Sequence, residues 1–185
     1  MEIQKLQSFH TLRKPTLDKY VNHTFFETGT YLGDSVKLAL ECGFEKIISV
    51  ELMEELQNQN RNKFKKELES GKVDLITGDT LLMIDSIIEG IEERATFWLD
   101  AHQDLGPAGE KPCPLYEEIE AIGKSKIKSH TIMIDDMRCL DGRFPWSVGI
   151  NQEGIIARLK AINPEYKISY EDGMVRNDIM VAYID

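Results

Sequence analysis

Short apolar stretches of strand length alternate with longer stretches of helical periodicity along this chain. The strand-like stretches are rich in β-branched and aromatic residues, and the stretches between them repeat apolar residues every three or four positions. We expect strands at 23–28, 46–52, 73–77, 95–101 and 130–135, and helices at 34–41, 53–69, 81–91, 114–123 and 152–162. This alternation predicts right-handed β-α-β crossovers and a parallel sheet.

The C-terminal residues carry two further strand patterns, joined by a short polar segment that contains Asp172-Gly173. This pattern indicates a hairpin, one strand of which must run antiparallel to the rest of the sheet. The predicted fold is α/β, a doubly wound, Rossmann-like sheet of seven strands that is mostly parallel and ends in an antiparallel hairpin. Because no linker divides the 185 residues, we expect a single domain at 1–185, with 1–22 as an N-terminal helical arm.

Charge and composition narrow the range of partners. The net charge of −10 disfavours phosphate backbones and anionic membrane surfaces, so neither nucleic acid nor a membrane is an expected partner. The longest apolar runs fall far short of a bilayer span, and the N-terminal stretch lacks the apolar core of a signal peptide. The three cysteines, Cys42, Cys113 and Cys139, lie far apart, which is typical of reduced thiols in a cytoplasmic protein.

A glycine-bearing turn follows the first expected strand, in the sequence ETGTYLGDS from Glu27 to Ser35. Gly29 permits a tight turn, and Gly33 would let the next helix pack close to the strand. The pattern is not the dinucleotide fingerprint, because Tyr31 stands where the middle glycine would be, and it is not a P-loop, because no Gly-Lys-Ser/Thr follows. Taken alone, it fits an ordinary strand-to-helix turn as well as a ligand site.

Polar residues also follow the second and third expected strands. Glu51, about twenty residues past the turn, suits the two hydroxyls of a ribose, and its alternative role is that of a surface glutamate. In Gly78-Asp79-Thr80, Asp79 could accept a hydrogen bond from an adenine amino group, and Asp79 or Thr80 could cap the next helix. Ligands of such sheets bind at the carboxyl ends of the strands, so these signals gain weight together.

The turn from Glu27 to Gly33, followed by Glu51 and Gly78-Asp79, resembles the class I S-adenosylmethionine-dependent methyltransferases over nearly the whole chain. The resemblance implies seven strands ending in a hairpin and a nucleoside-bearing sulfonium cofactor without pyrophosphate. The turn would hold the methionine end of this cofactor, and Asp34-Ser35 would cap the following helix. The residues expected to bind S-adenosylmethionine are Glu27, Thr28, Gly29, Thr30, Tyr31, Gly33, Ser35, Glu51, Gly78, Asp79, Thr80 and Asp100.

Acidic residues and a histidine follow the fourth and fifth expected strands. Asp100 and His102 come after the fourth strand, and Asp135 and Asp136 come after the fifth. Three carboxylates in one cleft would repel one another, and a hard divalent cation such as Mg²⁺ removes the conflict because it takes oxygen ligands. Such an ion could hold a substrate diol and lower the pKa of a hydroxyl. Alternatively, Asp135 or Asp136 caps a turn and only one carboxylate enters the site.

One Asp after the fourth strand and an Asp-Asp pair after the fifth resemble the metal-dependent sugar O-methyltransferases of the macrocin type. The catechol type has an Asp-Asn pair, and here Asp136 replaces that Asn. The resemblance implies Asp100, Asp135 and Asp136 as the metal ligands. Macrocin-type enzymes carry longer additions than this chain has, which leaves open the acceptor and the possibility of a homo-oligomer or of a domain within a larger protein.

Two irregular segments, 103–114 and 137–148, follow these carboxylate strands and are long for connections in this kind of fold. They could form the acceptor pocket and its lid. Arg138 could orient a substrate hydroxyl or acid, or form a surface salt bridge. Trp146 and Phe144 could stack on the face of a sugar, or anchor the loop.

The sequence thus predicts an S-adenosylmethionine-dependent O-methyltransferase, assisted by a divalent metal, that acts on a sugar or another small polyhydroxylated acceptor. His102 would act with Asp100 in catalysis as a general base or contact the substrate, and its alternatives are a metal ligand or a structural histidine. Other classes are a non-catalytic cofactor-binding module on the same fold, an NAD-dependent oxidoreductase, which Tyr31 disfavours, and a metal-dependent hydrolase that would use the carboxylates without Glu51 or Asp79.

Overall fold

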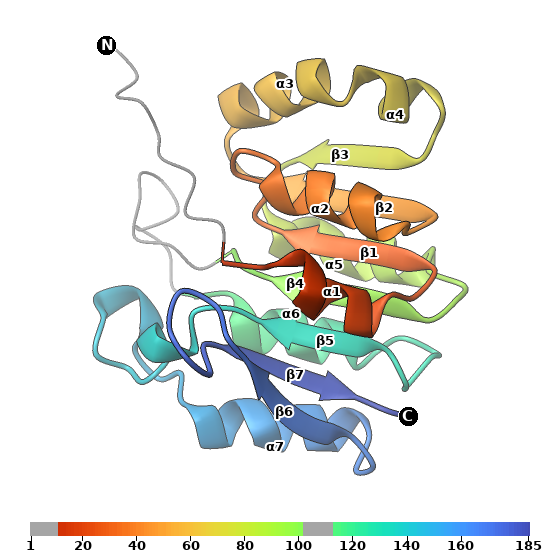
Figure 1. The fold of residues 1–185 in the computed structure, drawn as a ribbon. Coiled ribbons are helices and arrows are strands. Elements are labelled where there is room, and N and C mark those ends of the chain that lie inside the picture. Colours follow the sequence, from red (N-terminus) through yellow and green to blue (C-terminus); the bar gives the residue numbers. More distant parts are fainter. Residues whose placement is uncertain (1–10, 102–112) are drawn as a thin grey trace.

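The computed structural model describes residues 11–101 and 113–185, which form a seven-stranded sheet with helices on both faces (Figure 1). The strand order is β3-β2-β1-β4-β5-β7-β6, with β1 to β5 parallel and β7 antiparallel to both of its neighbours. The predicted doubly wound sheet with a C-terminal hairpin is therefore confirmed. The strands are β1 (Thr24–Thr28), β2 (Lys46–Glu51), β3 (Val73–Thr77), β4 (Ala95–Leu99), β5 (Thr131–Ile134), β6 (Lys167–Glu171) and β7 (Ile179–Tyr183).

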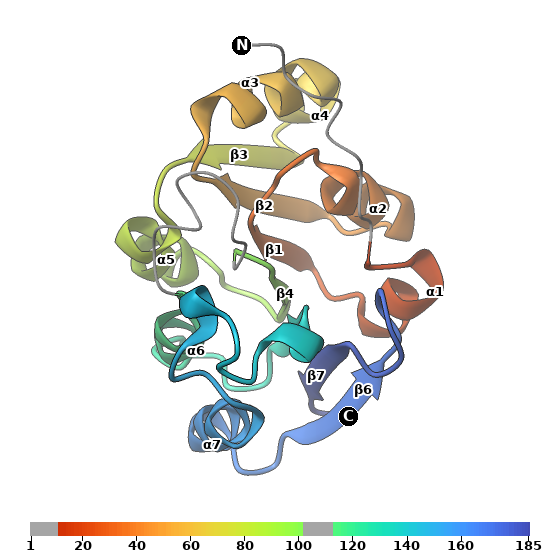
Figure 2. The same ribbon diagram turned by 90° about the vertical axis from the view of Figure 1, so that its left-hand side faces the viewer.

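The direction in which the chain adds strands reverses between β1 and β4. From β1 the sheet grows through β2 to β3 on one side, and through β4 to β5 on the other. Thr28, the last residue of β1, lies between Val50 of β2 and Leu99 of β4. Doubly wound sheets bind their ligands at such a switch point, beyond the carboxyl ends of the strands. Figure 2 looks onto this edge of the sheet.

Helices cover the two faces of the sheet as two separate layers (Figure 2). One core cluster joins α1, α2 and Phe64 to the sheet, and the other joins α5, α6 and α7 to the opposite face. No helix in the described ranges has the length and apolar character needed to cross a membrane. The helices are α1 (Lys14–Leu17), η1 (Asp18–Tyr20), α2 (Asp34–Cys42), α3 (Glu54–Lys63), α4 (Lys65–Glu69), α5 (Thr80–Glu89), α6 (Leu115–Ile122), η3 (Met137–Cys139), η4 (Pro145–Ser147) and α7 (Gln152–Ile162).

Two helical expectations differ from the structure. The stretch 53–69 is not one helix, because Phe64 leaves helical geometry at φ −108° and ψ 29° and separates α3 from α4. The Phe64 ring is buried against the core on the α2 side, and this tertiary contact overrides a local sequence that contains no helix breaker. Of the expected arm at 1–22 the structure describes 11–22, and within this part 14–20 are helical.

Candidate functional site

The turn after β1 lies directly over the switch point. The backbone N–H groups of Gly29 and Thr30 donate to the Val50 carbonyl at 2.9 and 3.2 Å, which folds the turn across the end of β2. Gly29 has φ +88°, and a Cβ at this position would lie 2.8 Å from the backbone oxygen of Asp100. The turns that follow β1 and β4 therefore touch, and only glycine fits at their contact.

The second glycine of the turn, Gly33, serves a different contact from the one expected. It has φ +72°, and a Cβ there would lie 2.5 Å from Asn60 Oδ1 and 2.7 Å from the Phe64 ring. Gly33 thus allows close packing of the turn against α3 and Phe64, rather than of a helix against its strand. Asn60 Nδ2 also donates to the Tyr31 carbonyl at 2.8 Å, so α3 supports the turn from the side.

The carboxyl group of Glu27 is buried beneath the turn. It accepts hydrogen bonds from the hydroxyls of Ser35 and Ser49. Burial raises the pKa of Glu27 to about 8, although both hydroxyls oppose that shift. Ser35 therefore does not cap α2 as expected, because its hydroxyl is used by Glu27, and Gly33 occupies the N-cap position of that helix. In this arrangement Glu27 supports the turn from below, and direct contact with a cofactor stays a prediction.

Glu51 connects the ends of three strands. One oxygen of its carboxylate accepts from the backbone N–H of Tyr31 at 2.8 Å, and the other accepts from that of Met53 at 2.9 Å. Its backbone carbonyl accepts from Gly78 N at 2.8 Å. Tyr31 takes the left-handed conformation, with φ +46°, at the point where its N–H faces Glu51. Glu51 is buried and acts at the switch point, so the alternative of a surface glutamate is wrong.

Asp79 caps the N-terminus of α5, as the sequence allowed. Its Oδ1 accepts from Leu81 N at 3.1 Å, and Thr80 is the first residue of the helix. Gly78, with φ +151°, makes the bend from β3 into this cap. The cap and a contact with an adenine amino group are compatible, because a carboxylate has a second oxygen and further lone pairs.

Glu118, a buried glutamate close to the site, was not predicted as a site residue from the sequence. Glu118 of α6 is 0% exposed, and neither oxygen of its carboxyl group has a hydrogen-bond partner among the described residues. Burial raises its pKa to about 8, opposed by the nearby Thr28 hydroxyl. The signal was present in the sequence, because Leu115, Glu118, Ile119 and Ile122 follow the i, i+3, i+4, i+7 spacing of a buried helical face.

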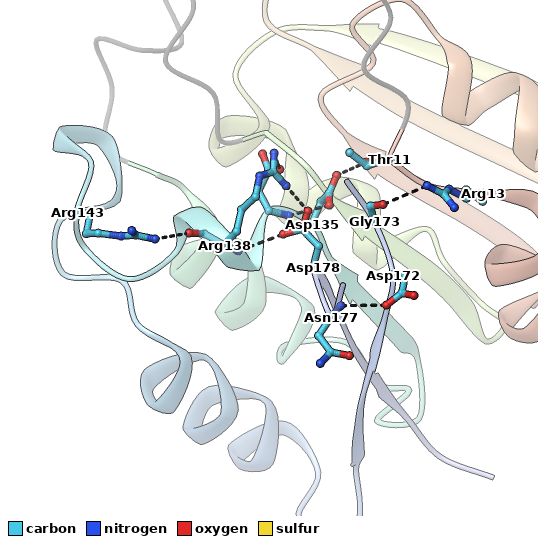
Figure 3. A network of polar contacts seen from close by, with 10 residues as sticks. Thr11, Arg13, Asp135, Arg138, Arg143, Asp172, Gly173, Asn177 and Asp178 are labelled. Carbon is cyan, nitrogen blue, oxygen red and sulfur yellow. Dashed lines mark hydrogen bonds and ion pairs between the residues drawn. The ribbon is translucent and has the colours of Figure 1, made fainter. Parts of the chain in front are cut away.

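Three acidic side chains gather between the end of β5 and the start of β7, and they include Asp178, which was not expected. Carboxylate oxygens of Asp135, Asp136 and Asp178 all lie within 4.8 Å of one another. Figure 3 shows Asp135 and Asp178 side by side. Asp178 precedes β7 and is buried. Burial, followed by the negative charge of Asp136, raises the pKa of Asp135 to about 7.

Asp100, which follows β4, is a further acid near this cluster. Its Oδ1 is buried and has no such partner among the described residues. Burial raises the pKa of Asp100 well above its usual value, and the charges of Asp135, Asp136 and Glu27 add to this effect. Asp100 is thus close enough to the Asp135–Asp136 pair for its charge to matter, although it is not among the three acids that meet within 4.8 Å.

Arg138 compensates part of this negative charge. It lies 2.6 Å from Asp136 Oδ1, and its guanidinium also pairs with Asp178. The backbone N–H of Arg138 donates to Asp178 Oδ1 at 3.1 Å. The expected contact of Arg138 with a substrate stays a prediction, and in the structure this side chain holds the start of β7 against the loop after β5 (Figure 3).

The residues present fit a divalent cation. Arg138 pairs with Asp136 and Asp178, and a carboxylate oxygen of Asp135 lies within 4.8 Å of these two acids. A buried oxygen of Asp100 also lacks a partner among the described residues. Oxygen donors of this kind suit Mg²⁺. Arg138 already pairs with Asp136, so it would compete with a cation for this expected ligand.

Two aromatic rings in the loop after β5 stack on each other. The rings of Phe144 and Trp146 lie 5.6 Å apart at an angle of 14°. Trp146 is buried, and its carbonyl accepts from Cys113 N at 2.8 Å, whereas Phe144 is 37% exposed. Trp146 thus anchors the loop, and Phe144 offers the exposed ring. His102 and most of the segment 103–114 lie outside the described residues.

Comparison with known proteins supports the fold. No protein-family model matches the chain, and no curated protein matches its sequence. Among solved structures, an O-methyltransferase from Bacillus cereus in complex with SAH (S-adenosylhomocysteine) is 17% identical, with a TM-score of 0.65 over 92% of this chain and 78% of that one.

Two further structures give a similar result. TomG from Streptomyces achromogenes, an O-methyltransferase of tomaymycin synthesis in complex with SAM, is 11% identical, with a TM-score of 0.65 over 92% of this chain and 77% of that one. The SAH-bound methyltransferase PaMTH1 from Podospora anserina is 16% identical, with a TM-score of 0.62 over 93% and 76%. This chain therefore has the Rossmann-like fold of these methyltransferases.

Proposed function

We propose that this protein is an S-adenosylmethionine-dependent O-methyltransferase, assisted by a divalent metal, that acts on a hydroxyl of a sugar or another small polyhydroxylated acceptor. The observation that carries the proposal is the junction at the switch point. There, the turn after β1 is fixed by Val50 and Glu51 of β2 and touches Asp100 after β4. Structural neighbours that carry SAM or SAH on the same fold support it.

The chain offers distinct groups for the two ends of the cofactor. Each carboxylate oxygen of Glu51 accepts one backbone hydrogen bond and keeps a second lone pair for a ribose hydroxyl. Asp79 stands at the end of β3 for the adenine amino group. The turn from Gly29 to Gly33, which is held over the end of β2 by hydrogen bonds to the Val50 carbonyl, would contact the methionine end through its backbone.

The acceptor side rests on the acids after β4 and β5. Asp100, Asp135 and Asp136 would hold a divalent cation, and the ion would lower the pKa of the acceptor hydroxyl when bound. S-adenosylmethionine, when bound, would supply a methyl group on a sulfonium, which the acceptor oxygen would take as S-adenosylhomocysteine leaves, and His102 would accept the hydroxyl proton. Alignment of the two reactants supplies most of the rate, because the displacement needs no covalent intermediate on the protein.

The formation of SAH from SAM, measured over a panel of sugars and polyols, tests this function. We expect turnover with at least one acceptor, loss of turnover in EDTA, and its return with Mg²⁺. Asp100→Asn should lower turnover at least about 100-fold, since a catalytic or liganding carboxylate is removed. Asp141→Asn is the matched control, because Asp141 is an exposed acid that pairs only with Arg143 among the described residues. Cofactor binding without turnover on the whole panel would instead indicate a non-catalytic module.

A further inference from the structure

The segment that precedes α1 contacts Asp135, one of the acids after β5. The hydroxyl of Thr11 donates to Asp135 Oδ2, although the two residues lie 124 positions apart in the sequence (Figure 3). Thr11 is 8% exposed, and Asp135 is 1% exposed, so this contact is shielded from water. Buried hydrogen bonds to a carboxylate are among the stronger polar contacts in proteins.

Other contacts fix this segment without the help of that hydroxyl. Leu12 and Leu17 are buried in the core cluster between the sheet and α2. Arg13 Nη2 lies 3.5 Å from the Gly173 carbonyl in the connection between β6 and β7. Because the leucines already anchor the chain on the sheet, the Thr11 hydroxyl is not needed to hold the segment in place.

The hydrogen bond instead contributes to the orientation of the Asp135 carboxylate. Asp135 Oδ1 accepts from Asp136 N at 2.7 Å, and Oδ2 accepts from Thr11, so each oxygen has a donor on a different part of the chain. Asp136 and Asp178 repel this carboxylate from nearby. Loss of the Thr11 donor would weaken the hold on this orientation against the repulsion of the other acids.

We propose that Thr11 is a positioning residue of the acceptor site, which holds Asp135 in the orientation that binds a divalent cation. The inference rests on the metal-assisted part of the proposed function. Partners in contact with metal ligands typically change metal affinity by about 10- to 100-fold when they are removed. Thr11 would thus make the N-terminal segment part of the site, rather than a separate arm.

The test compares Thr11→Val, which keeps the shape but removes the hydroxyl, with Thr11→Ser, which keeps the hydroxyl. Thr16→Val is the matched control, because Thr16 lies in the same segment and is also 8% exposed. Binding of Mn²⁺ alone is followed by electron paramagnetic resonance and calorimetry, binding of SAH is measured on the same samples, and thermal melting checks the fold.

We expect Thr11→Val to lose at least about 10-fold in Mn²⁺ affinity, with Thr11→Ser and Thr16→Val close to the original protein. SAH affinity should be unchanged in all three variants. Equal Mn²⁺ affinity of Thr11→Val and the original protein would overturn the inference, and so would an equal loss in Thr11→Ser. Absence of Mn²⁺ binding by the original protein would also overturn it, while SAH binding in that experiment would leave the cofactor part of the proposed function standing.

Discussion

Replacement of Gly33 by alanine tests whether α3 supports the turn at the switch point. The new Cβ would lie 2.5 Å from Asn60 Oδ1 and 2.7 Å from the Phe64 ring, so both side chains must move. Overpacking of a buried contact costs about 1–3 kcal/mol, and the left-handed conformation costs a non-glycine residue about 1–2 kcal/mol. A displaced Asn60 also loses its hydrogen bond to the Tyr31 carbonyl, for about 1 kcal/mol more.

The free energy of unfolding should therefore fall by about 4 kcal/mol in Gly33→Ala, from these three contributions together. Gly43→Ala is the control, because Gly43 has φ +88° but nothing within 4 Å of the added Cβ. It should lose only the conformational part, about 1–2 kcal/mol. For a chain of this size the difference corresponds to about 5–10 °C in Tm, measured by calorimetry. Equal Tm values for the two variants would refute the packing of α3 on the turn.

Two further substitutions test the buried charges. Glu118→Gln should raise Tm relative to the original protein at high pH. The pKa of Glu118 is raised to about 8 in the folded protein, so the stability that its protonated form contributes is lost as pH rises from about 4.5 through 8. A Tm difference that does not vary with pH would contradict this. Arg138→Met should lower the free energy of unfolding by up to about 3 kcal/mol, because it leaves the buried Asp178 without its ion pair. Adding Asp178→Asn should restore part of that loss in chemical denaturation, and a further decrease in the double variant would refute the pairing.

The periodicity of the sequence predicted the sheet because β-α-β alternation leaves few possible topologies. The positions of Glu51, Asp79, Asp100 and Asp135 also followed from it, since residues that come directly after parallel strands gather at one edge. Their roles toward a cofactor or a metal stay predictions.

What could not be predicted depends on contacts between distant parts of the chain. Gly33 packs against the Phe64 ring, and α3 ends at Phe64. The local sequence predicts neither the end of the helix nor the need for glycine at position 33. In the sequence, Asp178 belongs to the polar connection between the two strands of the hairpin. It lies beside Asp136 because β7 pairs with β5 in the sheet. The contact of Thr11 with Asp135 spans most of the chain.

Calorimetric titration with S-adenosylhomocysteine tests the cofactor site most directly. The comparison uses the original protein, Glu51→Ala and the control Glu54→Ala, which removes an exposed acid from the first turn of α3. We expect binding by the original protein and by Glu54→Ala, and at least about a 100-fold loss in Glu51→Ala, because hydrogen bonds to a charged carboxylate contribute about 1.5–3 kcal/mol each. Absence of binding by the original protein, or equal binding by a folded Glu51→Ala, would contradict the account.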